Sequence, residues 1–281
     1  MPKQFKKAAC FLTVLGLLTS FVFGAHSSYA MPKQKDAKQA TKVLSNSELK
    51  TLDLEGVENV DNLDDLLLDI DWGFDYETCE ELEQDGILYV INDNDEVVIT
   101  DCSDSIDKST ISIPDKIDGH PVTMIYYYVF SGLENTKTIN IPDSVKVIGA
   151  EAFAWSNNLQ TINIPTSVTT IDAAAFAGND KLQSITIPDS VTELGVGAFI
   201  LCENLTNVTL PNTISSIPYG TFAACVSLKK INIPSSVKTI EDEAFSMTGF
   251  TEFTVLDTIT SISARAFSDC ENLVKVTIPK T

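Results

Sequence analysis

The sequence predicts a β-rich, right-handed repeat solenoid with coils of about 23 residues and a β-hairpin cap at its N-terminal end. Proline recurs at a nearly constant interval, with Leu256 in its place in one unit, at Pro114, Pro142, Pro165, Pro188, Pro211, Pro234 and Pro279. Phenylalanine keeps the same interval, at Phe130, Phe153, Phe176, Phe199, Phe222, Phe245 and Phe267. Such a spacing of like residues indicates stacked units rather than one irregular domain.

The unit 159–176 shows why this repeat favours a coil. Ile162 and Ile164 alternate along a strand and point to one face, and Pro165 ends that strand because it has no amide hydrogen to donate. A second apolar side follows, and Phe176 closes a third. One coil cannot bury these groups alone, so neighbouring coils are expected to stack about 4.8 Å apart and to align like residues in ladders.

The solenoid is expected over 111–281, as eight units of which the first carries a five-residue insertion. A hairpin cap is expected before it, over 86–110. Strand-like runs at 87–91 and 97–99 flank the turn-forming residues 92–95. A hairpin at this place would cover the open apolar end of the stack.

Residues 1–30 are predicted to be a secretory signal peptide. Three lysines precede an apolar run over 8–23, and Ser28 and Ala30 place small side chains at the −3 and −1 positions of a cleavage site. The alternative is an uncleaved membrane anchor, but the run is short for a span, which needs about 20 residues. Cleavage would leave a protein without membrane insertion, either secreted or at the cell surface.

The negative charge is concentrated in one segment. Residues 31–50 are expected to form a flexible, Lys-rich linker, and residues 51–85 an acidic, partly helical segment. Residues 51–107 contain 20 Asp or Glu and no Lys or Arg, which accounts for the whole net charge of −20. This charge argues against a nucleic-acid partner, because phosphates are bound by cations. The acidic run 69–77 lacks EF-hand spacing, so a solvated acidic face is favoured over a calcium site.

No catalytic, cofactor or metal site is predicted. Cys202 and Cys225 occupy the same slot in adjacent units, three residues after the repeat Phe, and are expected to be free thiols in a structural ladder. For Cys79 and Cys102 the sequence leaves two alternatives equally open: the two residues form a bridge, or both are free thiols. His120 lies in an Asp-Gly-His-Pro turn, and nothing in the spacing organises a nucleophile around it.

The pattern I-x-I-P-x-S-V-x-x-I-x-x-x-A-F-x-x-C-x-x-L recurs in several units and is nearly intact from Ile187 to Leu205. In this pattern, and in residues 113–122, the chain resembles the BspA-like leucine-rich repeats of bacterial cell-surface and secreted proteins. The resemblance covers about 86–281. It implies a non-enzymatic extracellular protein that mediates adhesion or protein binding, with a host or neighbouring-cell surface component as the candidate partner.

Outward positions of the predicted strands form a row of short polar side chains, the candidate binding face. Its members are Asn140, Thr161, Asn163, Ser184, Thr186, Asn207, Thr209, Lys230 and Asn232. A face for a protein ligand and a solvated sheet of good β-formers explain this row equally well. A further hypothesis is a structural module of an extracellular or cell-envelope assembly, which self-associates through an uncapped C-terminal coil.

Four aromatic residues form a second candidate site. Tyr126, Tyr127 and Tyr128 lie in the enlarged first repeat, and Trp155 lies one unit later. Tyr and Trp are typical anchors of interfaces, so an exposed aromatic patch would suit a protein partner. The favoured alternative is that these rings pack against the hairpin cap.

Overall fold

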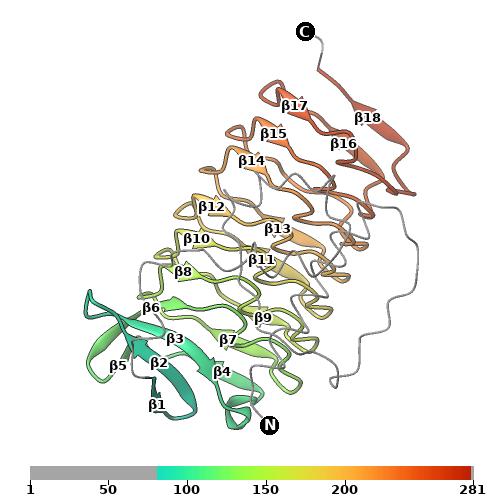
Figure 1. Ribbon diagram of the computed structural model, residues 1–281. Helices are drawn as coiled ribbons and strands as arrows, with labels where there is room; N and C mark the ends of the chain where they lie inside the picture. The colour runs from blue at the N-terminus through green and yellow to red at the C-terminus, as the bar shows by residue number, and fades with distance from the viewer. Residues whose placement is uncertain (1–80, 280–281) are drawn as a thin grey trace, which may run out of the picture. The chain divides into compact units, whose positions relative to one another are not determined.

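The computed structural model describes residues 81–279, which lie within one compact unit of the chain, Phe74–Thr281. Successive coils stack with strand above strand, and the described residues contain almost no helix (Figure 1). The prediction of a β-solenoid with coils of about 23 residues is confirmed. The predicted signal peptide, the linker and the acidic run 69–77 lie outside the described residues, as does Cys79.

Parallel strands form the first side of the coils, in three separate sheets. These are β4 (Thr110–Ser112), β7 (Thr138–Asn140) and β9 (Thr161–Ile162); β11 (Ser184–Thr186) and β13 (Asn207–Thr209); and β16 (Glu252–Thr254) and β18 (Lys275–Thr277). Paired residues are one repeat apart, as Ile185 and Val208 are. Residues 230–233 form no strand, so the polar row expected from the sequence does not lie on one unbroken sheet.

A second set of parallel strands forms another side of the coils. It comprises β6 (His120–Ile125), β8 (Val147–Ile148), β10 (Thr170–Ile171) and β12 (Glu193–Leu194), followed by β14 (Ser216–Ile217), β15 (Thr239–Ile240) and β17 (Ser261–Ile262). Most of these strands are two residues long. Such short strands persist because they pair with strands of neighbouring coils, and all of them except β17, whose Ile262 is exposed, bury an Ile or Leu in the common core.

The N-terminal cap is antiparallel and has three strands, β1 (Leu82–Gln84), β2 (Ile87–Ile91) and β3 (Val97–Cys102). The side-chain oxygen Oδ1 of Asn92 accepts hydrogen bonds of 3.0 Å from the backbone N–H groups of Asn94 and Glu96, which closes the β2–β3 turn. The predicted hairpin is therefore present. Strand β1 adds to it from a stretch in which the sequence analysis expected no strand.

The cap continues the second side of the solenoid, because β3 pairs in parallel with β6. The insertion in the first repeat is a small hairpin that joins β5 (Lys116–Ile117) to β6. Its turn, Asp118–Gly119, and the β1–β2 turn, Asp85–Gly86, both have positive φ at the two central residues (52° and 88°; 53° and 85°). This is the geometry of a type I′ turn, for which Asp-Gly is a preferred sequence.

The phenylalanine side chains form a single stack through the coils. From Phe130 to Phe245, neighbouring ring centroids are 5.2–5.7 Å apart and neighbouring ring planes lie within 13° of parallel. All six of these side chains are 0% exposed. Phe267 continues the stack at 5.5 Å from Phe245, although it is only half-buried. The predicted phenylalanine ladder is confirmed, and it loosens in the last coil.

Each coil from Phe130 to Phe245 turns twice through left-handed backbone, once on each side of its Phe, and the coil of Phe267 does so once, at Asp269. The first row of positive-φ residues is Tyr128, Glu151, Ala174, Gly197, Gly220 and Glu243. The second row is Gly132, Trp155, Gly178, Leu201, Ala224, Met247 and Asp269. Glycine adopts this conformation readily, whereas other residues lose about 1–2 kcal/mol in it. Stacking therefore imposes the same turn on residues that do not favour it.

In most coils the side chain three residues after the Phe binds the backbone of the preceding coil, whereas Thr248 donates to Phe245 of its own coil. Ser156 Oγ, Cys202 Sγ and Cys225 Sγ each donate to the carbonyl oxygen of the Phe one coil earlier, at 3.1–3.2 Å. Asn179 and Cys270 do the same at 3.0 and 3.1 Å. Cys202 and Cys225 are free thiols. The slot thus requires a short hydrogen-bond donor rather than a particular residue.

Gly178 and Gly132 provide a matched test of the contact between coils. Their φ values are 66° and 68°, but a Cβ added at Gly178 would lie 2.3 Å from a ring carbon of Trp155, whereas one added at Gly132 would meet nothing within 4 Å. We expect Gly178→Ala to lower the free energy of unfolding by about 1–3 kcal/mol more than Gly132→Ala, because only the first change places a methyl group against the Trp155 ring of the neighbouring coil. Denaturant unfolding measures both, and equal losses would contradict the contact.

Candidate binding surfaces

The nine polar side chains of the candidate binding face are all exposed on the first side of the coils. Six of them lie on β7, β9, β11 and β13, whereas Asn163, Lys230 and Asn232 lie outside the strands. Equivalent positions in paired strands are neighbours, so their side chains stand about 5 Å apart. Hydroxyl and amide groups at this spacing present both donors and acceptors to a partner.

The asparagines of the candidate binding face also stabilise the fold. The Asn163 amide accepts from the N–H of Ile141 and donates to its carbonyl, both at 2.9 Å, and so takes the place of a backbone pair beside β9. Asn140 Nδ2 donates to Ser112 Oγ at 3.1 Å. Asn163 is therefore occupied by its own chain, and the Thr and Ser members of the row are better placed to contact a partner.

A second polar row, which the sequence analysis did not single out, lies on the second side of the coils. Its exposed members stand two residues before a strand Ile or Leu, at Lys146, Thr169, Thr192, Ser215, Lys238 and Thr260. Thr169 and Thr260 donate their hydroxyl groups to carbonyl oxygens one coil earlier, at 3.3 and 3.2 Å. The same 23-residue interval in the sequence would have located this row. The solenoid thus presents two polar sides.

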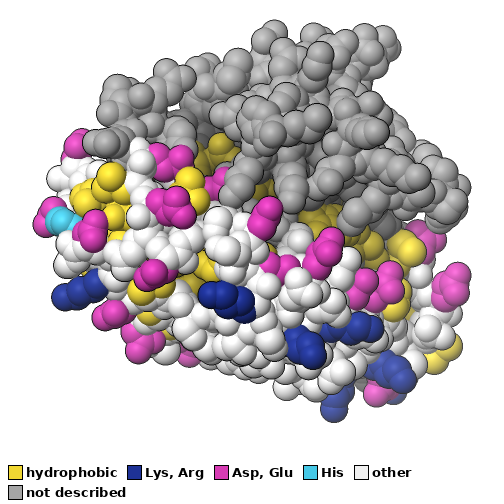
Figure 2. All heavy atoms as spheres, turned by 90° about the horizontal axis from the view of Figure 1, so that it is seen from below, with side chains coloured by type: hydrophobic (Ala, Val, Ile, Leu, Met, Phe, Trp, Pro, Cys, Tyr) yellow, Lys and Arg dark blue, Asp and Glu magenta, His cyan; other side chains and the backbone are white. Residues whose placement is uncertain are grey.

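Charged groups are mixed on the surface. Figure 2 shows one face on which Lys and Arg side chains are interspersed with Asp, Glu and uncharged groups. Lys146 of the second row forms an ion pair of 2.7 Å with Glu96 of the cap, and this contact lowers the pKa of the Glu96 carboxyl. Mixed charge favours short-range specific contacts over long-range attraction of one sign.

The aromatic residues predicted as a second site are mostly packing groups. Tyr126 and Tyr128 are 8% and 5% exposed, so an exposed patch is wrong for these two. Tyr127 and Trp155 are half-buried. The backbone N–H of Tyr126 donates to the carbonyl of Ile99 in β3, at 2.9 Å, which places this segment against the cap. Their apolar rings extend the core where the cap meets the first coils.

Two buried carboxyl groups lie at the turns before the phenylalanines. Glu151 is 1% exposed, and the Tyr128 hydroxyl donates to its Oε1 at 2.9 Å. Burial raises the pKa of Glu151 to about 8, although the bond from Tyr128 lowers it. Burial likewise raises the pKa of Asp172 to about 6, against the effect of a backbone bond from Ala173. The two groups are enclosed in neighbouring coils, so their effect is on stability.

A third buried carboxyl, Glu243, lies at the same turn near the other end of the described solenoid. Its Oε1 is 3.2 Å from Nη1 of Arg265, which also contacts Asp242 at 2.6 Å. Burial raises the pKa of Glu243, and the charge of Arg265 opposes that rise. Arg265 therefore joins two coils by satisfying a carboxylate that the stack has buried.

His120 directly follows the Asp118–Gly119 turn, at the start of β6, and its Nδ1 is 2.9 Å from Oδ1 of Asp95. Within 81–279, no cluster of three or more His, Cys, Asp or Glu side chains is arranged to hold a metal ion. Among the same residues, no helix is long and apolar enough to cross a membrane. Cys79 lies outside the described residues, so neither of the two alternatives for Cys79 and Cys102, a bridge or two free thiols, is tested.

The repeats match a known family over more than half of the chain. The sequence model of the "BspA type Leucine rich repeat region" matches residues 123–249 and 238–281, with six copies. The chain belongs to the BspA-type leucine-rich repeat family. Leucine-rich repeat proteins generally mediate protein–protein interaction and are typically non-enzymatic. No curated protein shows a significant sequence match to the chain.

Several solved structures are similar to this BspA-type chain. The leucine-rich repeat protein TpLRR of T. pallidum has a TM-score of 0.55 and 26% identity, over 70% of this chain and 82% of that one. A leucine-rich repeat protein from Bacteroides ovatus has a TM-score of 0.45 and 24% identity, over 71% of each chain. A leucine rich cell surface protein from Faecalibacterium prausnitzii has a TM-score of 0.35 and 17% identity, over 72% of this chain and 95% of that one. The likeness to TpLRR agrees with the repeat architecture described above.

The stability of this BspA-type solenoid is expected to fall as pH rises from about 5 to 8. In that interval Glu151 keeps its proton in the folded chain, whereas the unfolded chain has already lost it, so a higher pH favours unfolding. Glu151→Gln cannot ionise and still offers an oxygen to Tyr128. We expect the variant to exceed the wild type in unfolding free energy at pH 8 by on the order of a few kcal/mol, with little difference near pH 4.

Urea unfolding at a series of pH values measures this effect. The exposed Glu203→Gln is the control, and it should follow the wild-type curve. A constant difference between Glu151→Gln and wild type from pH 5 to 8 would show that Glu151 does not retain its proton in the fold.

Proposed function

We propose that this protein is secreted or exposed at the cell surface, has no enzymatic activity, and binds a protein ligand in adhesion. The proposed ligand is a surface component of a host or of a neighbouring cell. The secretory signal predicted over residues 1–30 supports the location. Membership of the BspA-type family supports the binding role, since repeat solenoids commonly use their extended sides to contact other proteins.

The observation that carries the proposal is the exposed polar row on the first side. Thr186 and Thr209 are paired neighbours on β11 and β13, and both side chains are exposed. No hydrogen bond from either hydroxyl group to another described residue is found. Two rigid strands therefore hold these donors and acceptors in fixed positions, which lowers the entropy lost when a partner is bound.

The test is capture of a ligand from extracellular-matrix and cell-wall fractions by the mature protein. Thr186→Arg combined with Thr209→Arg should abolish capture, because two long charged side chains would block the first side without disturbing buried groups. The matched control, Thr169→Arg combined with Thr192→Arg, alters the second side and should retain capture. If only the control pair lost capture, the binding face would lie on the second side instead. If neither pair reduced capture, neither side would be the binding face.

A second candidate function is self-association in an extracellular or envelope assembly. In the last described coil, Val274, Val276 and Ile278 are 88%, 51% and 71% exposed. In the part of the chain that the structure describes, strand β18 pairs with β16 on one edge only. An apolar surface beside an open strand edge favours pairing with another chain, and a second copy of this chain is the partner proposed here.

Sedimentation at increasing protein concentration tests this candidate. The wild-type chain should form oligomers that disappear in Val274→Lys combined with Ile278→Lys. Val226 is also exposed, at 49%, but lies on an interior coil, so Val226→Lys should leave the oligomers unchanged. A wild-type chain that remains monomeric throughout would refute self-association.

A further inference from the structure

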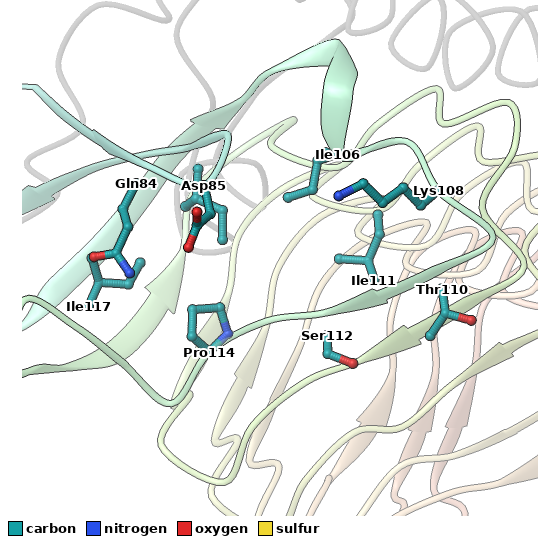
Figure 3. A pocket seen from close by; sticks show the side chains of 10 residues that line it. Gln84, Asp85, Ile106, Lys108, Thr110, Ile111, Ser112, Pro114 and Ile117 are labelled. Atoms are coloured by element: carbon teal, nitrogen blue, oxygen red, sulfur yellow. The ribbon is translucent and has the colours of Figure 1, made fainter.

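A pocket of about 250 Å³ lies between the cap and the first coil, away from both polar rows. Figure 3 shows Ile106, Ile111 and Ile117 around its apolar floor, with polar side chains at the rim. Pockets that enclose drug-sized molecules are usually larger, about 300–1,000 Å³. The volume therefore suits one aliphatic side chain of a larger partner better than a free small molecule.

The pocket lies along an open strand edge. Among residues 81–279, strand β4 is the terminal strand of its sheet and pairs with β7 alone. Backbone bonds to β7 involve the carbonyl of Ser109 and the N–H of Ile113, at 3.1 and 3.0 Å. Alternate residues of a parallel strand bond to the same neighbour, so Thr110 and Ser112 direct their backbone groups away from β7. Both residues line the pocket.

Two residues of opposite charge, Asp85 and Lys108, line the pocket at separate positions. Asp85 lies in the type I′ turn between β1 and β2, where positive φ at two successive residues holds its position. Lys108 precedes β4, and its side chain extends above Ile111 with the nitrogen toward Ile106, whereas Asp85 lies above Pro114 (Figure 3). Within 81–279, neither charge is within ion-pair distance of an opposite one. Both residues are exposed in the described part of the chain.

We propose that an extended peptide segment of a partner protein binds here by adding a strand to β4. One aliphatic side chain of the segment fills the pocket, with an acidic residue on one side near Lys108 and a basic residue on the other near Asp85. Backbone bonds to an open edge provide affinity in this mode of recognition, and pockets for alternate side chains provide specificity. The inference rests on the proposed function in taking a protein as ligand, but it uses a different surface.

Two fluorescent, end-blocked pentapeptides serve as probes with the full chain. Glu-Thr-Ile-Thr-Lys and Lys-Thr-Ile-Thr-Glu each place both charges and the Ile on one face of a strand, because alternate residues share a face. They match a segment that runs parallel or antiparallel to β4. We expect one of them to bind in fluorescence anisotropy at least tenfold more tightly than Thr-Thr-Ile-Thr-Thr, which lacks the charges.

Ser112→Pro tests the strand edge directly. Proline removes the outward N–H and is tolerated in edge strands, so the β4–β7 pairing should survive. We expect peptide binding to weaken at least tenfold in Ser112→Pro and to change little in the matched Ser112→Ala, with thermal unfolding as the check on folding. Lys108→Glu is the second variant, and it should weaken binding of the preferred peptide without altering the strand.

Three results would overturn the proposal. The first is that neither charged peptide binds at concentrations up to about 1 mM; a dissociation constant of that size corresponds to a binding free energy of roughly −4 kcal/mol. The second is equal binding by Ser112→Pro and Ser112→Ala. The third is a wild-type dimer that Ser112→Pro dissociates, which would assign the edge to a second copy. Thr186→Arg with Thr209→Arg should leave peptide binding unchanged, so failure here and failure of the proposed binding face are distinguishable.

Discussion

The stacking of one coil on the next is the constraint on which the rest of this structure depends. Rings 5.2–5.7 Å apart can form an unbroken file only if every coil returns to the same place after nearly the same number of residues. The two left-handed turns around each Phe and the donor slot after it repeat for this reason. The first-repeat insertion is tolerated because hairpin β5–β6 projects it out of the coil.

This constraint separates the residues that hold the fold from those that can vary. Phe, Ile and Val fill the interior, and even polar groups such as Glu151 and Asn179 are drawn into contacts between coils. Specificity must then come from side chains that point outward or from places where the repeat is broken. The two polar rows are of the first kind, and the pocket between the cap and β4 is of the second.

The interior was more predictable than the surface. The phenylalanine ladder, the free thiols of Cys202 and Cys225 and the hairpin over β2 and β3 follow from residue type and spacing. Strand β1 is not evident from the sequence, although Asp85-Gly86 is a preferred hairpin turn, because the acidic composition around it is typical of a solvated segment. The burial of Tyr126 and Tyr128 depends on how the enlarged first repeat meets the cap, and no local pattern reveals that contact.

The amino-acid sequence alone determined the period, the residues of the core and the family, because units with like residues at a constant interval bury their apolar sides by stacking on one another in register. Only the tertiary structure decided that the first side is divided into three sheets, that Asn163 is engaged with Ile141, and that β4 leaves an open edge beside a pocket. These features arise where adjacent coils or the cap depart from the average repeat. Their geometry depends on contacts between segments that no single unit contains.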